Sequence, residues 1–352
     1  MNRRSLIGTA AVGSAMALTL AACGSGSGSS KSGTLHVGLS VANISLNFAS
    51  EMVDGAKQAA AHSKDVSLKV VGPPNTDGPA EEQLFANLVT TAKDGVVLEN
   101  LDPPIFTRPA ANAVNSGVTV VALDTAPTSG SKVDLYVGND NYEIGVALAQ
   151  EAIKRMSKDP HGVVVVGVPN PGTPVLDSRA KGIKDTFAKQ APNVKVLGPY
   201  QTYSDPAQNY GAWQAQVNAH PTALAFLGVG DADSYDLAKL KQQRHGKWLV
   251  AGTDVDAKTL EDVKAGLDFA TIDPEHFLKG YIATKLLIDH DRGAKLPSGW
   301  FETPSLVVDQ SNVDKIIARE KSQTAAYDFY KDQIDKLMGD IDANMKPLSE
   351  AR

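Results

Sequence analysis

Apolar and polar residues alternate along the chain with two distinct periods from Thr34 onward. Short runs rich in Val, Leu and Ala predict strands that are buried on both faces, as in a parallel sheet. These runs are 35–41, 66–71, 95–98, 118–123, 135–137, 163–168, 194–197, 223–227, 248–251 and 269–272. Between them, apolar residues recur at i, i+4 spacing, which predicts amphipathic helices. Examples are Phe48, Met52, Ala56 and Ala60.

Strands that alternate regularly with helices indicate an α/β fold built from parallel sheets with right-handed crossovers. Ten strands would strain a single twisted sheet, so we expect two sheets in two Rossmann-like lobes. The alternation restarts after the fifth strand, within residues 134–141. This position is therefore the predicted break between the lobes.

The last part of the chain, residues 310–352, has a different pattern. Apolar residues punctuate a highly charged stretch at positions Ile316, Ile317, Tyr327, Tyr330, Ile334, Leu337 and Ile341. The spacing predicts a C-terminal amphipathic helical extension laid on one lobe. A contact between copies of the chain is the alternative interpretation of the same apolar face.

The start of the chain has the pattern of a bacterial export signal. Two arginines precede an uncharged apolar run, which ends in Leu-Ala-Ala before Cys23. The run is shorter than a membrane span, and its small-residue end resembles a lipobox, so residues 1–22 are the predicted signal peptide. Cys23 is then the predicted lipidation site, and the Gly- and Ser-rich residues 23–33 form a flexible tether. The Sec and twin-arginine export routes both remain open.

Composition narrows the classes of function. The formal charge of −6 argues against a nucleic-acid partner, because phosphate binding needs a basic face. Cys23 is the single cysteine, so no disulfide or thiolate metal site is expected. The sequence has no phosphate loop or catalytic motif, and its seven histidines show no metal-ligand spacing. We therefore expect no cofactor and no metal, and we interpret each histidine as a surface residue or a satisfied core residue.

Polar side chains recur where the predicted strands end, which is the edge at which open parallel sheets bind ligands. Carboxylates and amides accept hydrogen bonds from hydroxyls, an arginine donates in a planar fork, and an aromatic ring covers the apolar face of a sugar. The candidate ligand-binding residues are Asn43, Asn47, Phe48, Asp102, Asp124, Arg179, Tyr203, Asp231, Asp254 and Asp273. Asp and Asn at these positions are also common helix caps and turn formers, so each has this structural alternative.

The order of these residues resembles the type I periplasmic sugar-binding proteins, the ribose-binding-like family, from about residue 34 to about residue 308. The matching segments are GLSVANISLNFASEMVDGAKQAA, VTVVALDTAP with Asp124, VGNDNYEIGVALAQ, the Arg-x-x-Gly element at Arg179, AGTDVD with Asp254, and ATID with Asp273. Three differences bear on the ligand. The usual Asn-Asn-Pro-Phe-Phe segment reads Ser-Leu-Asn-Phe, Gly230 replaces an asparagine, and Asp273 stands where the family often has glutamine.

The resemblance implies two lobes, 34–136 with 273–301 and 137–272 with 302–309, joined by a three-segment hinge. We also expect a monomeric extracytoplasmic protein, which the lipobox at the start of the chain would anchor to the cell membrane through Cys23. This protein would capture a small sugar or polyol in the cleft and deliver it to an ABC transporter permease without catalysing a reaction. A sensor subunit that signals to a membrane receptor is the first alternative, and a sugar-processing enzyme built on the clustered aspartates is the second. The sequence leaves the identity of the sugar or polyol open.

Overall fold

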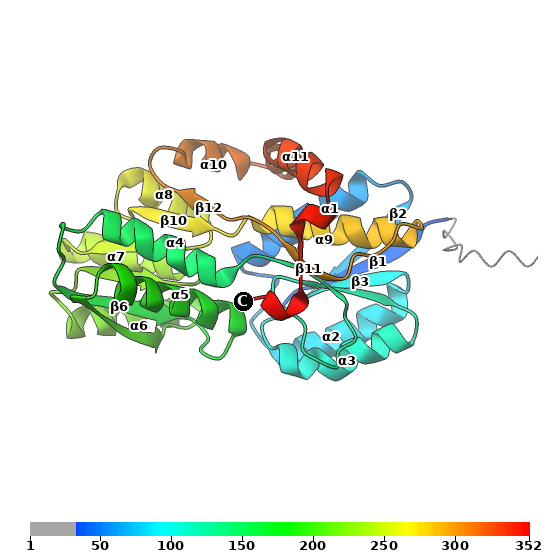
Figure 1. Cartoon of the computed structure of the whole chain (residues 1–352), viewed down its shortest axis with the longest axis horizontal. Helices are drawn as coiled ribbons and strands as arrows, with labels where there is room; N and C mark the ends of the chain where they lie inside the picture. The colour runs from blue at the N-terminus through cyan, green and yellow to red at the C-terminus, as the bar shows by residue number, and fades with distance from the viewer. Residues whose placement is uncertain (1–32) are drawn as a thin grey trace, which may run out of the picture.

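A computed structural model describes residues 33–352 of the chain (Figure 1). The predicted signal peptide 1–22, the predicted lipidation site Cys23 and all but the last residue of the tether lie outside the described residues. None of the helices within 33–352 combines the length and the apolar character needed to cross a bilayer.

The first lobe, called the N-lobe here, is built on a seven-stranded sheet in the order β13-β11-β5-β4-β3-β1-β2. All neighbouring pairs are parallel except β13 with β11. Its strands are β1 (Leu35–Ser40), β2 (Val66–Val71), β3 (Gly95–Glu99), β4 (Thr119–Leu123), β5 (Leu135–Gly138), β11 (Gly299–Glu302) and β13 (Met345–Lys346). Its helices are α1 (Asn47–Ala61), α2 (Gly78–Thr91), α3 (Pro103–Asn115) and α9 (His276–Asp291).

The second lobe, the C-lobe, has a six-stranded sheet in the order β12-β10-β9-β8-β6-β7, in which β12 is antiparallel. Its strands are β6 (Gly162–Val168), β7 (Val194–Gln201), β8 (Ala225–Gly228), β9 (Leu249–Thr253), β10 (Ala270–Asp273) and β12 (Leu306–Val308). Its helices are α4 (Asn141–Lys154), α5 (Pro174–Gln190), α6 (Pro206–Ala219), α7 (Asp233–Arg244) and α8 (Ala257–Ala265). The predicted α/β class with two lobes is confirmed.

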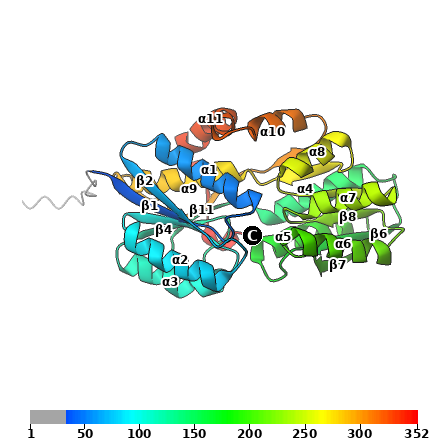
Figure 2. The ribbon, with the colours of Figure 1, turned by 180° about the vertical axis from the view of Figure 1, so that it is seen from behind.

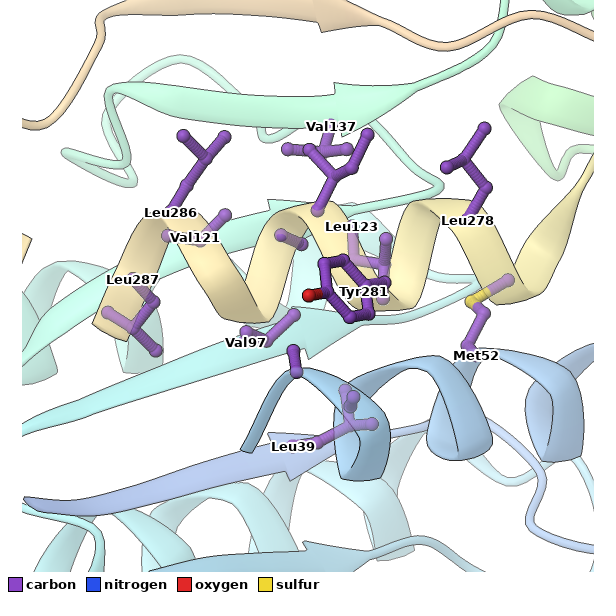
Figure 3. Packing of buried hydrophobic residues seen from close by; sticks show 14 of the residues in the cluster. Leu39, Met52, Val97, Val121, Leu123, Val137, Leu278, Tyr281, Leu286 and Leu287 are labelled. Atoms are coloured by element: carbon purple, nitrogen blue, oxygen red, sulfur yellow. The ribbon is translucent and has the colours of Figure 1, made fainter. Parts of the chain in front are cut away.

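The N-lobe core shows why α9 belongs to the first lobe although it follows β10 in the chain. Figure 3 shows α9 packed beside α1, with Leu278, Tyr281 and Leu286 among the side chains of the sheet. Nearly every position of α9 is buried, because it lies between the sheet and the helices that cover it. Burying so many apolar side chains, at roughly 1.5–3 kcal/mol each, fixes α9 and hence the residues at its first turn.

The chain passes between the two sheets after β5, after β10 and after β11. Val137 and Gly138 pair with Phe301 and Glu302 in the N-lobe sheet, so these residues belong to the first lobe. The expected boundaries at 136/137 and 301/302 are therefore displaced by one or two residues. Hydrogen bonding within the sheet decides where each lobe ends. The apolar pattern does not show this boundary, because it continues from the strand into the connection.

The C-terminal extension differs from the expected helix on one lobe. It forms α10 (Val313–Arg319), α11 (Gln323–Gly339), the single turns η1 (Asp342–Asn344) and η2 (Leu348–Glu350), and strand β13. Helix α10 packs on α8 of the C-lobe, whereas α11 packs on α1 and α9 of the N-lobe, so the chain passes between the lobes a fourth time (Figures 1 and 2). Ser322 starts the second helix, since its hydroxyl accepts a hydrogen bond from the Ala325 amide at 3.1 Å.

Candidate functional site

A cavity of about 50 Å³ lies where the carboxyl ends of the strands of the two sheets meet. At about 10–15 Å³ for one water, this is room for a few water molecules. The N-lobe contributes Leu46, Phe48, Leu101, Asp124 and His276, and the C-lobe contributes Pro169, Asn170, Val175, Leu176, Arg179, Ser204, Gly230, Asp231, Ala232 and Asp254. Five of the ten predicted residues are among them, namely Phe48, Asp124, Arg179, Asp231 and Asp254.

Arg179 lies on α5 and is only 2% exposed. Its Nε donates to the side-chain oxygen of Asn141 at 2.9 Å, and its Nη1 donates to Thr253 Oγ1 at 3.0 Å. Both carboxylate oxygens of Asp254 lie 3.4 Å from the same Nη1. These contacts hold the guanidinium plane in place at the cavity wall, where it can donate to an oxygen of a bound molecule.

Asp124 and Asp254 occupy equivalent positions in the two lobes. Asp124 directly follows β4 and Asp254 directly follows β9, and each of these strands is the neighbour of a hinge strand in its sheet. Both aspartates have a left-handed backbone, with φ of 63° and 70° respectively. The backbone amide of each donates to a neighbouring strand at 2.9 Å, to Val137 and Ile272 respectively. Aspartate tolerates this conformation better than most residues, and it turns both carboxylates toward the cavity.

The Asp124 carboxylate forms an ion pair with the Lys279 ammonium, and both side chains are almost completely buried. Burial alone would raise the pKa of Asp124, but nearby positive charge, above all that of Lys279, lowers that pKa to about 2. Asp124 is therefore ionised, and its charge is balanced within the protein before any ligand enters.

His276 begins α9 and connects the two aspartates. Its Nε2 lies 2.9 Å from Asp254 Oδ1, and its Nδ1 lies 4.0 Å from Asp124 Oδ1. Burial, together with the positive charge of Lys279, lowers the pKa of His276. In the neutral ring, the contact with the Asp254 carboxylate requires the proton on Nε2, so Nδ1 is an acceptor.

The pKa of Asp254 is lowered. Burial opposes this shift, but the Arg179 guanidinium and the hydrogen bond from His276 outweigh burial. Both carboxylates next to the hinge are thus ionised and paired with cationic or donating groups.

Asp231 has no such cation. Its Oδ2 accepts the backbone amide of Asn47 at 3.2 Å, and its Oδ1 is shielded from solvent without a hydrogen-bond partner. Burial, followed by the negative charges of Asp254 and Asp256, raises the pKa of Asp231 well above its usual range. A ligand that donates to Asp231 would remove the cost of this unsatisfied group.

Asn47 lies between the lobes rather than among the cavity-lining residues. Its amide nitrogen Nδ2 donates to the carbonyl of Val255 in the C-lobe, and its backbone amide reaches Asp231 in the same lobe. These two contacts join the first turn of α1 to the opposite lobe, so the lobes are closed on each other. Phe48, the next residue, forms part of the cavity wall, with its ring centroid 5.8 Å from that of His276.

The structure places Asn43 and Asp102 away from the cavity lining. The Asn43 side chain accepts the Ser45 amide at 2.9 Å and donates to Thr76 at 3.3 Å, which is the turn-forming alternative. Asp102 precedes α3 and lines a separate groove with Asp77 and Glu81. Both residues follow strands that lie further from the hinge, β1 and β3, and their side chains contact nearby loops instead of the cavity.

Tyr203 and Asp273 are also not part of the cavity lining. Tyr203 is 39% exposed, and its neighbour Ser204 lines the cavity instead. Asp273 is completely buried, and its carboxylate accepts from Arg319 Nη1 at 2.6 Å. The C-terminal extension supplies this arginine, so Asp273 is neutralised inside the hinge and does not face a ligand.

Sequence reasoning missed His276 and Lys279. His276 was interpreted as an ordinary surface or core histidine; it is buried and bonded to Asp254, as a core histidine can be, and it also lines the cavity. The two positions are three apart at the start of the helix that follows β10, so they share one helical face. That spacing directly after a hinge strand is the signal that could have found them. Within residues 33–352, no cluster of three or more His, Cys, Asp or Glu is arranged to hold a metal ion.

Two α/β lobes of mostly parallel strands, joined by a hinge and with a cavity at their junction, are the architecture of type I periplasmic binding proteins. Residues 37–295 match the family described as periplasmic binding protein domain. The chain belongs to this family.

Curated relatives agree with this membership. The D-allose-binding periplasmic protein of Escherichia coli K12 is 23% identical over 245 residues, covering 67% of this chain and 78% of the relative. The xylitol-binding protein of Mycolicibacterium smegmatis is 26% identical over 202 residues, covering 56% of this chain and 54% of the relative.

Solved structures show the same fold. The solute-binding protein of an ABC transporter from Burkholderia graminis, in complex with D-arabinose, has a TM-score of 0.72 and 26% identity, covering 80% of this chain and 97% of its own. A periplasmic solute-binding protein from Actinobacillus succinogenes, with bound D-allose, has a TM-score of 0.73 and 21% identity, covering 79% and 98%.

Proposed function

We propose that the chain captures a small sugar or polyol in the interlobe cavity and delivers it to an ABC importer. The observation that carries this proposal is the cavity itself, which both lobes line and in which three carboxylates, a guanidinium and an imidazole converge. Such a set of acceptors and donors suits a ligand with several hydroxyls. The relatives support this ligand class, since they are named for D-allose and xylitol and one solved structure holds D-arabinose.

The proposed ligand-binding residues are Phe48, Asp124, Arg179, Asp231 and Asp254, with His276 added. Arg179 donates to a ligand oxygen, the carboxylates accept from hydroxyls, and the Phe48 ring covers a C–H face. For binding at a micromolar dissociation constant, the net free energy would be roughly 8 kcal/mol. A few charge-assisted hydrogen bonds of about 1.5–3 kcal/mol each account for much of this.

Closure of the lobes would couple binding to delivery. The contacts from Asn47 to Asp231 and to Val255 form only when the lobes meet. Opening about the hinge separates these partners and exposes the cavity to solute. A permease that recognises the closed shape would then receive loaded protein in preference to empty protein.

The proposal includes an extracytoplasmic location, with the lipid on Cys23 as the attachment to the cell membrane. The support for this is the apolar run that ends in Leu-Ala-Ala before Cys23 and the Gly- and Ser-rich segment after it. We propose that the chain acts as a monomer and catalyses no reaction, as expected of a carrier whose ligand leaves unchanged.

The experiment is a thermal-shift screen of the mature protein against aldoses, deoxy sugars and polyols, followed by titration calorimetry of the ligands that shift melting. A ligand at a hundredfold excess over its dissociation constant stabilises the folded state by about 2.7 kcal/mol, which is easily detected. Mass analysis of the recovered ligand checks for turnover. A complete absence of binding across all three ligand classes contradicts the proposal, and conversion of the ligand contradicts the carrier role.

A further inference from the structure

The cavity has chemically different sides. The hinge lies at the β5 and β11 edge of the N-lobe sheet and at the β10 and β12 edge of the C-lobe sheet. The strands and helix next to it provide Asp124, Asp254 and His276. The Arg179 guanidinium also reaches this side, because it contacts Thr253 at the end of β9. The side chains of Asp124, Asp254, His276 and Arg179 therefore line the hinge side of the cavity.

The side further from the hinge is apolar. Leu46 follows β1, Leu101 follows β3, and Pro169 follows β6, while Val175 and Leu176 form the first turn of α5. All five residues line the cavity. This outer side therefore offers mainly carbon to a bound molecule.

The outer side also holds two polar residues, which are joined by one hydrogen bond. Asn170 Nδ2 donates to Ser204 Oγ at 2.7 Å. Among the cavity-lining residues, the buried side-chain atoms without a hydrogen-bond partner are Asp231 Oδ1 and His276 Nδ1. Both can pair with a hydroxyl of a ligand. Asp231 follows β8, which is next to β9 in the sheet, and His276 follows the hinge strand β10. The buried polar atoms that lack a partner therefore lie toward the hinge, whereas the outer side presents mainly carbon to a ligand.

We propose, building on the sugar-binding function above, that the ligand is a deoxy sugar, with its hydroxyls toward the hinge and a methyl group against Leu101, Val175 and Leu176. A hydroxymethyl arm packed against these three side chains would find no hydrogen-bond partner on them, whereas a methyl group packs there at no such cost. An apolar pocket discriminates against an added hydroxyl by up to about a hundredfold. The expected preference is therefore between about fivefold and a hundredfold.

The experiment uses sugar pairs that differ only in one hydroxyl. Titration calorimetry on the mature protein compares D-fucose with D-galactose, L-rhamnose with L-mannose, and 6-deoxy-D-glucose with D-glucose, beside pentoses and polyols. We expect the deoxy member of the pair with matching stereochemistry to bind at least five times more tightly. Equal or tighter binding of the hydroxymethyl member overturns the proposal.

A variant tests whether the apolar wall causes the preference. Val175→Thr places a hydroxyl in that wall with almost no change of shape, so the ratio of the two affinities should fall at least threefold. Val163→Thr makes the same change in β6 at a position outside the cavity lining, and it should leave the ratio unchanged. Melting curves of both variants confirm that each is folded. If folded Val175→Thr keeps the same ratio of affinities for the deoxy sugar and its hydroxymethyl partner, the proposed contact between Val175 and the methyl group is overturned.

The outcomes separate this inference from the function on which it rests. Binding of pentoses or polyols alone overturns the deoxy-sugar proposal and leaves the sugar-carrier proposal standing. A lack of binding by every sugar and polyol overturns both.

Discussion

At the scale of single residues, the cavity shows how buried charges are balanced. Asp124 is paired with Lys279, and Asp254 is paired with Arg179 and His276, whereas Asp231 has only a backbone amide. Removing one partner of a buried pair leaves an uncompensated charge, which is costly. Asp231 is a different case, because its free oxygen is unsatisfied from the start. The two kinds of residue should respond differently to substitution.

Lys279→Met should lower the free energy of unfolding by about 3–5 kcal/mol at pH 7, because it leaves the Asp124 carboxylate buried without its cation. Chemical denaturation measures this. Lys57→Met is the matched control, since the Lys57–Asp54 pair is exposed and should contribute only about 0–1 kcal/mol. The double variant Lys279→Met with Asp124→Asn should regain much of the loss. Equal costs for the Lys279 and Lys57 variants would contradict the buried pairing.

The same pair predicts a pH dependence in acid. The pKa of Asp124 is about 2 in the folded protein and about 3.9 in an unfolded chain. The stability that ionised Asp124 contributes is therefore fully present above about pH 4 and is lost as pH falls toward 2. Asp124→Asn should flatten this part of the stability curve, and a curve as steep as that of the wild type would argue against the shift.

Asp231→Asn should weaken ligand binding at least tenfold while the free energy of unfolding at pH 7 stays equal or rises. The raised pKa of Asp231 means that the folded state binds a proton more tightly than the unfolded state. Stability therefore falls as pH rises above the unfolded value of about 3.9, and the variant removes this fall. Calorimetry and denaturation between pH 4 and 8 check both parts. A strongly destabilised variant would show that Asp231 has a structural role instead.

Half of the predicted site residues lie in the cavity, and the reason is local. Asp124 and Asp254 follow the strands next to the hinge, so strand order alone aims them correctly. Asn43 follows the more distant β1 and forms a turn, whereas Asp273 forms an ion pair with Arg319, which is distant in the sequence. The sequence identifies the polar residue in each case, but it does not show which side chain or ligand forms its hydrogen bond in the folded protein.

At the scale of elements, two glycines let α4 and α5 approach closely. A Cβ atom at Gly145 would lie 1.9 Å from the carbonyl oxygen of Arg179, and one at Gly182 would lie 2.2 Å from that of Tyr142. No real Cβ fits at such distances, so each helix requires a glycine where it crosses the other. The position of α5, and with it the Arg179 guanidinium, depends on this contact.

Gly145→Ala should therefore displace α5, lower the melting temperature and weaken ligand binding at least fivefold, because the backbone that would have to move is that of Arg179 itself. Gly211→Ala in α6 is the matched control. A Cβ atom there meets no atom within 4 Å, so this variant should keep its affinity and gain up to about 1 kcal/mol of stability. Thermal melting and calorimetry measure both effects. Unchanged affinity in Gly145→Ala would separate the helix crossing from the site.

The elements themselves were largely predictable. The ten expected strands correspond to β1 to β10, because parallel strands buried on both faces form continuous apolar runs. Strands β11, β12 and β13 were missed. β12 and β13 are edge strands of three and two residues, which is too short for a pattern, and the four residues of β11 (GWFE) lack the Val- and Ala-rich run of the other strands. The single helix expected in the extension is interrupted at residues 320–322, where the chain changes lobes.

At the scale of the whole molecule, the C-terminal extension ties the two lobes together near the hinge. Arg319, at the end of α10, donates to Asp273 in the C-lobe sheet and to the Tyr330 hydroxyl on α11, each at 2.6 Å. Further on, the carbonyl of Arg352 accepts the amide of Asn141 at the start of α4, also at 2.6 Å. Figure 1 shows the end of the chain between the lobes. Opening the cleft must therefore deform or break these contacts.

Deletion of residues 340–352 should make the ligand-free protein more open, because it removes β13 and the contact between Arg352 and α4 while α11 remains. The radius of gyration from small-angle X-ray scattering should increase without ligand and return to the full-length value with ligand. Affinity should fall by roughly two- to tenfold, since less of the protein is in the binding-competent closed form. Arg352→Ala, which loses the side-chain contacts to Asp140, Tyr142 and Glu143 but keeps β13 and the backbone contact, should show a smaller effect. Identical scattering and affinity for all three proteins would exclude this restraint.

The sequence by itself determined the alternation of strands and helices, the division into two lobes and the position of Asp124, Arg179 and Asp254 at strand ends or the helix beside them. These features follow from local periodicity, which each segment carries on its own. Only the tertiary structure decided which groups neutralise one another. Asp124 meets Lys279 across 155 positions of sequence, and Asp273 meets Arg319 across 46. Such pairs depend on how the lobes and the extension pack, because packing decides which opposite charge lies next to a buried carboxylate.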